Sequence, residues 1–146
     1  MSFFKKYSLF VAIACLFSTP VIAKENSNQQ INCLAQNAYF EAGNQPIQGK
    51  IAVSYVVMNR VGDKRFSDTP CGVIHQKHQF SWYNHGNKKI KDQETYQQCV
   101  QVARQVYFKR VPDNTHNSNF YHANYVNPRW GYTKVARIGA HYFYKG

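Results

Sequence analysis

Residues 47–61 (IQGKIAVSYVVMNRV) constrain the fold of this 146-residue chain more than any other segment does. Their length suits a helix, and their apolar residues fall on nearly all of its sides rather than on a single stripe. A helix of this kind is shielded from water only when other elements surround it. The segment therefore predicts a central, buried helix, with Pro46 in its first turn.

Two further helices are predicted on either side of that segment. Over residues 29–42 the apolar residues recur at spacings of three and four, which places them on one helical face: Ile31, Leu34, Ala35, Ala38 and Ala42. Gly43 is expected to end this helix in a left-handed conformation. Asp92 is expected to cap the helix that follows it.

Strand-like alternation appears in the second half of the chain, over residues 79–83, 119–122 and 138–144. A short helical turn is predicted over residues 71–76, and a turn over residues 127–131 separates the last two strands. Helices come first, followed by short strands and one more helix. This order indicates an α+β fold with a single core.

The first 23 residues have the layout of a secretory signal peptide. Lys5 and Lys6 precede an apolar run over residues 8–17, and small or apolar residues stand before Lys24. The run is too short for a permanent membrane span, which needs about 20 apolar residues. We therefore expect export to the periplasm or the medium, a flexible lead-in over residues 24–32, and one domain over residues 33–146.

The mature chain is strongly basic. Eighteen basic residues, two of them in the leader, stand against seven acidic ones, which leaves a net charge of +9 after cleavage. Such a surface attracts polyanions: nucleic acid, acidic lipid, or the carboxylates and teichoic acids of bacterial walls. Export disfavours nucleic acid as the partner.

Three cysteines remain after the predicted cleavage, and an exported protein can form disulfides. Cys33 lies in the apolar pattern of a helix, so it is interpreted as a small core residue. The pairing expected first is therefore Cys71 with Cys99. No pair of cysteines has the spacing of a structural zinc site.

Glu41 shares one helical face with Leu34 and Ala38. Burial on an apolar face is costly for an ionised carboxylate and raises its pKa, as a general acid near neutral pH requires. The alternative is a glutamate at the end of its helix that reaches water or a salt bridge.

The aromatic residues and the scarcity of acids narrow the chemistry. Phe, Tyr and Trp make up 16% of the chain, and their flat faces can pack on sugar rings, which favours a glycosidase. Hydrolysis by the usual glycosidase mechanisms needs two carboxylates. No other acid is an obvious partner for Glu41, so a single-acid mechanism, with a hydroxyl of the sugar as nucleophile, is preferred.

The six histidines raise the alternative of a metal hydrolase. The chain has no HExxH motif, and His75 and His78 lie in a polar loop without a nearby acid. His122 and His141 fall on predicted strands and could form a pair. A serine or cysteine nucleophile is less favoured, because Ser81 and Cys71 stand in no recognised nucleophile context. We expect no metal and no cofactor.

Several motifs, in one order, resemble the SleB/CwlJ-type cell-wall hydrolases. They lie at residues 33–35 (CLA), 39–42 (YFEA), 49–53 (GKIAV), 59–61 (NRV), 65–69 (RFSDT), 71–74 (CGVI), 79–82 (QFSW), 120–123 (FYHA), 126–130 (VNPRW) and 134–144 (KVARIGAHYFY). The resemblance implies a compact, mainly helical domain of the lysozyme-like and resuscitation-factor-like kind, with a small antiparallel sheet.

The resemblance also implies a substrate and a site. The substrate would be peptidoglycan glycan strands, or spore cortex in sporulating relatives, and the catalytic acid falls on Glu41. The implied groove positions are Gln79, Phe80, Ser81, Trp82, Tyr121, His122 and His141. Where the family often has a second glutamate, this chain has Gln45, which favours the one-acid mechanism of a lytic transglycosylase.

The expected protein is thus a wall-associated monomer that cuts glycan between its MurNAc and GlcNAc sugars. Two alternatives remain at this stage: an N-acetylmuramoyl-L-alanine amidase, and a protein that binds peptidoglycan without cutting it.

Overall fold

A computed structural model describes residues 19–84, 86 and 88–146. Five helices and three strands follow in the order α1 Thr19–Ala42, α2 Ile47–Val61, α3 Pro70–His75, α4 Ser81–Asn84, α5 Gln93–Tyr107, β1 Phe120–Ala123, β2 Thr133–Ile138 and β3 His141–Lys145. Most of the predicted signal peptide, residues 1–18, lies outside the described residues. Residues 24–32, expected as a flexible lead-in, are instead helical and belong to α1, where Ile31 is buried.

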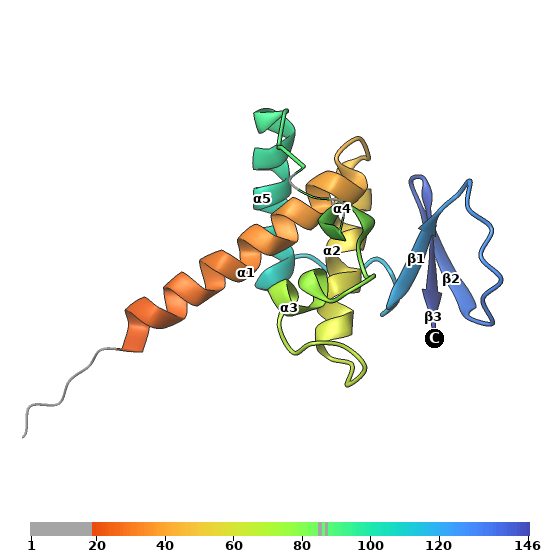
Figure 1. Cartoon of the computed structure of the whole chain (residues 1–146), viewed down its shortest axis with the longest axis horizontal. Coiled ribbons are helices and arrows are strands. Elements are labelled where there is room, and N and C mark those ends of the chain that lie inside the picture. Colours follow the sequence, from red (N-terminus) through yellow and green to blue (C-terminus); the bar gives the residue numbers. More distant parts are fainter. Residues whose placement is uncertain (1–18, 85, 87) are drawn as a thin grey trace, which may run out of the picture.

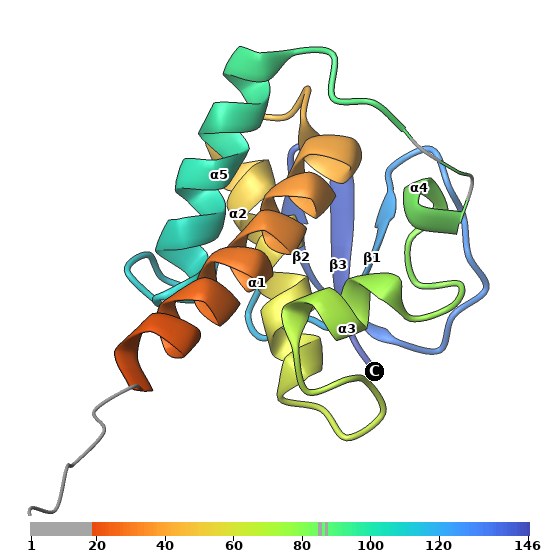
Figure 2. The same ribbon diagram turned by 60° about the vertical axis from the view of Figure 1, so that its left-hand side comes forward.

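Helix α2 lies at the centre of the molecule, as predicted. Helices α1, α3 and α5 pack on it from one side and the sheet from the other (Figures 1 and 2). Residues 49–57 of α2 are all buried. Pro46 stands one position before the helix rather than in its first turn.

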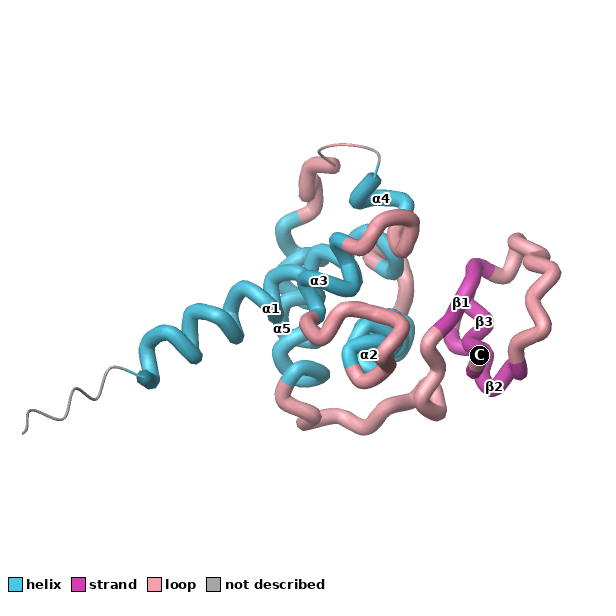
Figure 3. The backbone as a smooth tube through the Cα atoms, turned by 60° about the horizontal axis from the view of Figure 1, so that its bottom comes forward, coloured by secondary structure: helices cyan, strands magenta, loops and turns pink. Residues whose placement is uncertain are grey.

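The sheet is antiparallel, with β3 between β1 and β2. Phe143 of β3 is fully buried against Ala52 and Val56 of α2. Residues 138–144 do not form one strand as predicted, because the chain reverses at Gly139, whose φ of +56° suits glycine. Figure 3 shows the sheet beside the helices, at the opposite end of the molecule from the start of α1.

The strand predicted over residues 79–83 is wrong. Residues 81–84 form the one-turn helix α4, and no strand of the described chain pairs with this segment. The indole N–H of Trp82 donates to Asn37 Oδ1 of α1 at 3.0 Å, so the segment is fixed by a side chain. The helix predicted after Asp92 is confirmed: the Asp92 carboxylate accepts the backbone N–H of Thr95.

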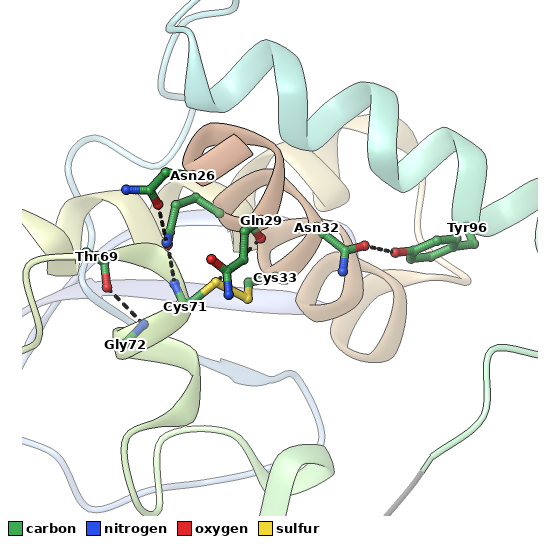
Figure 4. Close-up of a disulfide and its surroundings, with 9 residues drawn as sticks. Asn26, Gln29, Asn32, Cys33, Thr69, Cys71, Gly72 and Tyr96 are labelled. Atoms are coloured by element: carbon green, nitrogen blue, oxygen red, sulfur yellow. Dashed lines mark hydrogen bonds between the residues drawn. A yellow bond between two sulfur atoms is a disulfide. The ribbon is translucent and has the colours of Figure 1, made fainter. Parts of the chain in front are cut away.

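The disulfide joins Cys33 of α1 to Cys71 of α3, with their Cα atoms 5.3 Å apart (Figure 4). The expected Cys71–Cys99 pairing is wrong, because Cys99 is a free, fully buried thiol of α5. The apolar pattern that assigned Cys33 to the core applies equally to Cys99. Gln30 also links these helices, since its Oε1 accepts the backbone N–H of Cys71 at 2.9 Å.

The corner between α1 and α2 is fixed by Lys50, which is only 3% exposed. Its ammonium group donates to the carbonyl oxygens of Gly43, at 2.9 Å, and Gln45. Gly43 does not have the positive φ expected of it. No larger residue fits at position 43, because a Cβ there would lie 2.5 Å from the carbonyl oxygen of Tyr39. The end of α1, with Glu41, is therefore held rigidly.

None of the helices in the described part of the chain is long and apolar enough to cross a membrane.

Candidate active site

A cleft of about 480 Å³ lies between the end of α1, the segment around α4 and strand β1. All the side chains expected at the site border it. The full lining is Phe40, Glu41, Arg60, His78, Gln79, Phe80, Ser81, Trp82, Lys88, Tyr121, His122, Ala123, Tyr125, Val126 and His141. A second hollow of about 440 Å³ shares Phe40, Trp82 and Lys88 with it. The two hollows are therefore adjacent, and together they form a longer groove.

Glu41 is the next-to-last residue of α1 and is half-buried in the wall of the cleft. Burial raises its pKa, while a hydrogen bond from Tyr121 and the positive charges of Lys88 and Arg60 act in the opposite direction. The Tyr121 hydroxyl donates to Glu41 Oε2 at 2.9 Å. The expected burial and raised pKa are confirmed, and no salt bridge to Glu41 is present among the described residues.

Tyr121 remains a neutral phenol in this setting. Burial and the neighbouring Glu41 hold its pKa well above the ordinary value. Its hydroxyl therefore keeps the proton that it donates to Oε2. A proton on the Glu41 carboxyl group is accordingly carried by the other oxygen, Oε1.

Arg60 places a buried cation in the same wall, and the sequence-based reasoning did not assign it to the site. It is 6% exposed, and its guanidinium carbon lies 5.0 Å from the ring centroid of Phe66 and 5.4 Å from that of Phe80. Its Nε donates to the carbonyl of Asn119 at 2.8 Å, whereas Nη1 has no hydrogen-bond partner among the described residues. The sequence feature that could have indicated Arg60 is the presence of a single arginine within the apolar segment 47–61.

The 79–82 segment divides between core and cleft. Phe80 and Trp82 are only 2% and 7% exposed, and Trp82 stacks on Phe40 with ring centroids 4.7 Å apart. These two rings mainly support the wall, whereas Ser81 is exposed and Gln79 half-exposed at the cleft. All four residues of this segment line the cleft, and the side chains most open to solvent there are those of the polar pair, Gln79 and Ser81.

His122 and His141 do not form the pair considered for a metal. His141 pairs with Ala123 across the sheet and His122 pairs with Tyr142, so the two imidazoles lie on opposite faces. The buried His141 ring meets Tyr121 edge-on at 5.2 Å, and burial lowers its pKa. The His122 ring is bonded to Tyr144 on the other face, although His122 also borders the cleft. No cluster of three metal-ligating side chains occurs in the described part of the chain.

The other described acids have structural partners or lie away from the cleft. Asp113 accepts hydrogen bonds from Thr115, Asn59 and Asn117, which outweigh the effect of its burial and lower its pKa. Asp63 is paired with Arg65 at 2.6 Å. Among the described residues, Glu41 is the one carboxylate that lines the cleft.

Gln45, which stands where the resembling family often has glutamate, does not line the cleft. Its side-chain oxygen accepts the backbone N–H of Ala140 at 2.9 Å. The residue ties the α1–α2 corner to the turn between β2 and β3, so its role is structural. A carboxylate oxygen at this position could accept the same bond.

The structure thus combines a mainly helical domain, a small sheet and a single carboxyl group in a groove. Comparisons with known proteins show the family in which this arrangement occurs. The profile of the Cell Wall Hydrolase family matches residues 44–144, and the chain belongs to that family. The match begins three residues after Glu41.

Similar proteins include the spore cortex-lytic enzymes of Bacillus subtilis strain 168 and Bacillus cereus. The first is 29% identical over an alignment of 124 positions that covers 80% of this chain and 38% of that protein. The second is 29% identical over an alignment of 122 positions that covers 82% of this chain and 45% of that protein. The chain therefore spans less than half the length of these relatives.

Two solved structures share the fold. The catalytic domain of Bacillus cereus SleB has a TM-score of 0.67 at 26% identity, covering 80% of this chain and 89% of that one. The catalytic domain of SleB from Bacillus anthracis, described as a germination-specific lytic transglycosylase, has a TM-score of 0.65 at 28% identity, covering 80% and 93%. The expected α+β, mainly helical fold with a small antiparallel sheet is confirmed.

Proposed function

We propose that this chain is a lytic transglycosylase that cleaves peptidoglycan glycan between MurNAc and GlcNAc, with Glu41 as its catalytic residue. The observation that carries the proposal is a single half-buried carboxyl group of raised pKa in a cleft that adjoins a second hollow. The family and the description of the SleB domain from Bacillus anthracis support it.

The reaction needs one group that first gives a proton and then takes one. Glu41 Oε1 protonates the glycosidic oxygen, and the bond between that oxygen and the muramoyl C1 breaks as positive charge develops on the ring. The resulting Glu41 carboxylate then accepts the proton of the 6-hydroxyl as O6 bonds to C1. The product is a 1,6-anhydromuramoyl end, and Glu41 regains its proton.

Tyr121 and Arg60 prepare Glu41 for this alternation. Burial raises the pKa of Glu41 and so favours its protonated form, while the Tyr121 hydroxyl and the Arg60 charge favour the carboxylate that exists between the two proton transfers. Gln79 and Ser81 offer hydrogen bonds to sugar groups at the cleft, and Phe80, Trp82, His122 and His141 complete its walls.

We further propose that the mature protein acts outside the cytoplasm as a wall-associated monomer. The Cys33–Cys71 disulfide supports this location, because disulfides persist mainly in oxidising compartments. The net charge of +9 after cleavage of the predicted leader suits an anionic wall.

Fragment analysis tests the activity. The protein lacking residues 1–23 is incubated with purified sacculi, and the released fragments are identified by mass spectrometry. We expect 1,6-anhydromuramoyl ends, and we expect Glu41→Gln to release none while folding normally. Glu94→Gln is the matched control, since Glu94 is exposed at the start of α5, and it should cleave like the wild type.

Other products would contradict the proposal in distinct ways. Reducing muramic acid ends would show hydrolysis by water. Intact glycan with released stem peptides would show an amidase. Binding to sacculi without any released fragment, in wild type and Glu41→Gln alike, would show a binding protein.

A further inference from the structure

The sheet has a second face that the proposed reaction does not use. Tyr121 and Phe143 point toward α2, so their neighbours along the strands point the other way. Tyr142 and Tyr144 lie on this outer face, together with the ring of His122, a residue of the edge strand β1 that also borders the cleft. Within the described part of the chain no helix covers it, and the connection between β1 and β2 runs along it (Figures 1 and 3).

The aromatic side chains of this face are held in place by one another. The His122 ring stacks on Tyr144 at 5.2 Å, and its two nitrogens are hydrogen-bonded to the Tyr144 hydroxyl and the Ala123 carbonyl. Trp130, from the β1–β2 connection, contacts Tyr144 edge-on at 5.8 Å. Because these rings are already held in place, they lose little conformational freedom when a ligand binds to them.

Two of the rings remain open to solvent. Trp130 is 42% exposed and Tyr132 is 38% exposed. The same connection carries Tyr125 and Val126, which are exposed and line the active-site cleft. The same connection therefore borders the cleft, at Tyr125 and Val126, and the outer face, at Trp130.

The segment that forms the sheet and its connections carries charge of one sign. Residues 114–146 contain four basic residues, Arg129, Lys134, Arg137 and Lys145, and no acidic residue. The Lys134 ammonium lies 4.1 Å from the Tyr142 ring centroid, and the Arg137 guanidinium carbon lies 5.5 Å from it. Neither cation has a carboxylate partner among the described residues.

We propose that this outer sheet face, made of Trp130, Tyr132, Tyr142, Tyr144, Lys134 and Arg137, is a second binding surface for peptidoglycan, separate from the cleft. Exposed aromatic rings match the apolar faces of sugars, and the two cations match the carboxylates of stem peptides. A strand held here keeps the enzyme on the wall between cleavage events. The inference rests on the proposed function, since it takes the same polymer as the ligand.

Co-sedimentation with purified sacculi tests the surface, using chains that carry Glu41→Gln so that the polymer stays intact. Trp130→Ala and the pair Lys134→Gln/Arg137→Gln should each weaken binding about five- to tenfold. The control pair Arg104→Gln/Lys109→Gln removes the same charge at the end of α5, on the other side of α2 from the sheet (Figure 1). It should change binding less than twofold.

A second measurement separates this surface from the cleft. With Glu41 intact, the outer-face variants should cleave short soluble glycan fragments at the wild-type rate, yet release fragments from whole sacculi several times more slowly. Unaltered melting temperatures show that the variants fold, and Tyr132→Ala, at the other exposed ring of this face, replaces Trp130→Ala if that variant does not fold.

Three results would overturn the second surface. They are unchanged sedimentation of the outer-face variants, an equal loss in the α5 control pair, and a loss confined to the charge variants, which would show attraction by charge alone. Failure of the wild-type chain to cleave any glycan is a different outcome, and it would overturn the proposed function instead.

Discussion

Glu41 is a carboxyl group whose protonated form suits its surroundings better than its charged form. Its pKa in the folded protein is raised above the ordinary 4.5, chiefly by burial. The carboxyl group therefore contributes stability below about pH 4.5, and this contribution is lost as the pH rises through the native pKa.

Glu41→Gln should consequently melt at a higher temperature than the wild type at pH 7 and above. Glutamine cannot ionise, and its side-chain oxygen can still accept the Tyr121 hydroxyl. The two melting curves should converge as the pH falls below 4.5. A variant less stable than the wild type at pH 8 would show that Glu41 is not buried in this way.

Tyr121→Phe removes the hydroxyl that donates to Glu41 at 2.9 Å. Because that bond favours the carboxylate, its loss should raise the pKa of Glu41 further. We expect the alkaline limb of the pH–rate profile to move to higher pH, and the maximal rate to fall about tenfold or more, as for a hydrogen bond to a charged group. Tyr107→Phe, in α5, is the matched control and should leave the profile unchanged.

At the scale of elements, the contact between Gln45 and the turn after β2 should contribute to the stability of the fold. Gln45→Ala leaves the Ala140 N–H without its acceptor and should lower the free energy of unfolding by about 1 kcal/mol, measured by urea denaturation. Gln45→Glu keeps an acceptor and should cost less, with cleavage of soluble glycan unchanged. Loss of cleavage in Gln45→Glu would place this position in the catalytic machinery, against the structure.

The elements predicted correctly are those whose signal is local. Residues 47–61 are apolar on all sides and Asp92 is a good cap, and both features act within one helix. The 79–83 segment has the alternation of a strand, but a strand also needs a neighbour, and that is decided by the rest of the fold.

The site shows the same division. Glu41 was predictable because its spacing alone places it on an apolar face, and the family resemblance supplied the groove positions. The opposite orientations of His122 and His141 depend on strand register, which alternation does not fix between separate strands. Arg60 was missed because its partners, Phe66, Phe80 and Phe120, come from three separate segments.

For the whole molecule, the Cys33–Cys71 disulfide closes a loop of 38 residues. Loop-closure entropy for that length corresponds to about 4 kcal/mol, so reduction should lower the melting temperature by many degrees. The Cys33→Ala/Cys71→Ala variant should melt at the lower temperature with or without reductant. A wild-type chain indifferent to reductant would show that the cysteines are not paired.

The same covalent link joins α1, which carries Glu41, to α3, which leads into the 79–82 wall of the cleft. This covalent link, which adds to the hydrogen bonds made by Gln30 and Trp82, forms only where thiols can be oxidised. A newly made chain in a reducing cytoplasm lacks this fastening, and we expect it to be easily degraded there. If the protein is exported and cleaves the wall as proposed, its full assembly is in this way delayed until it has reached the compartment that holds its substrate.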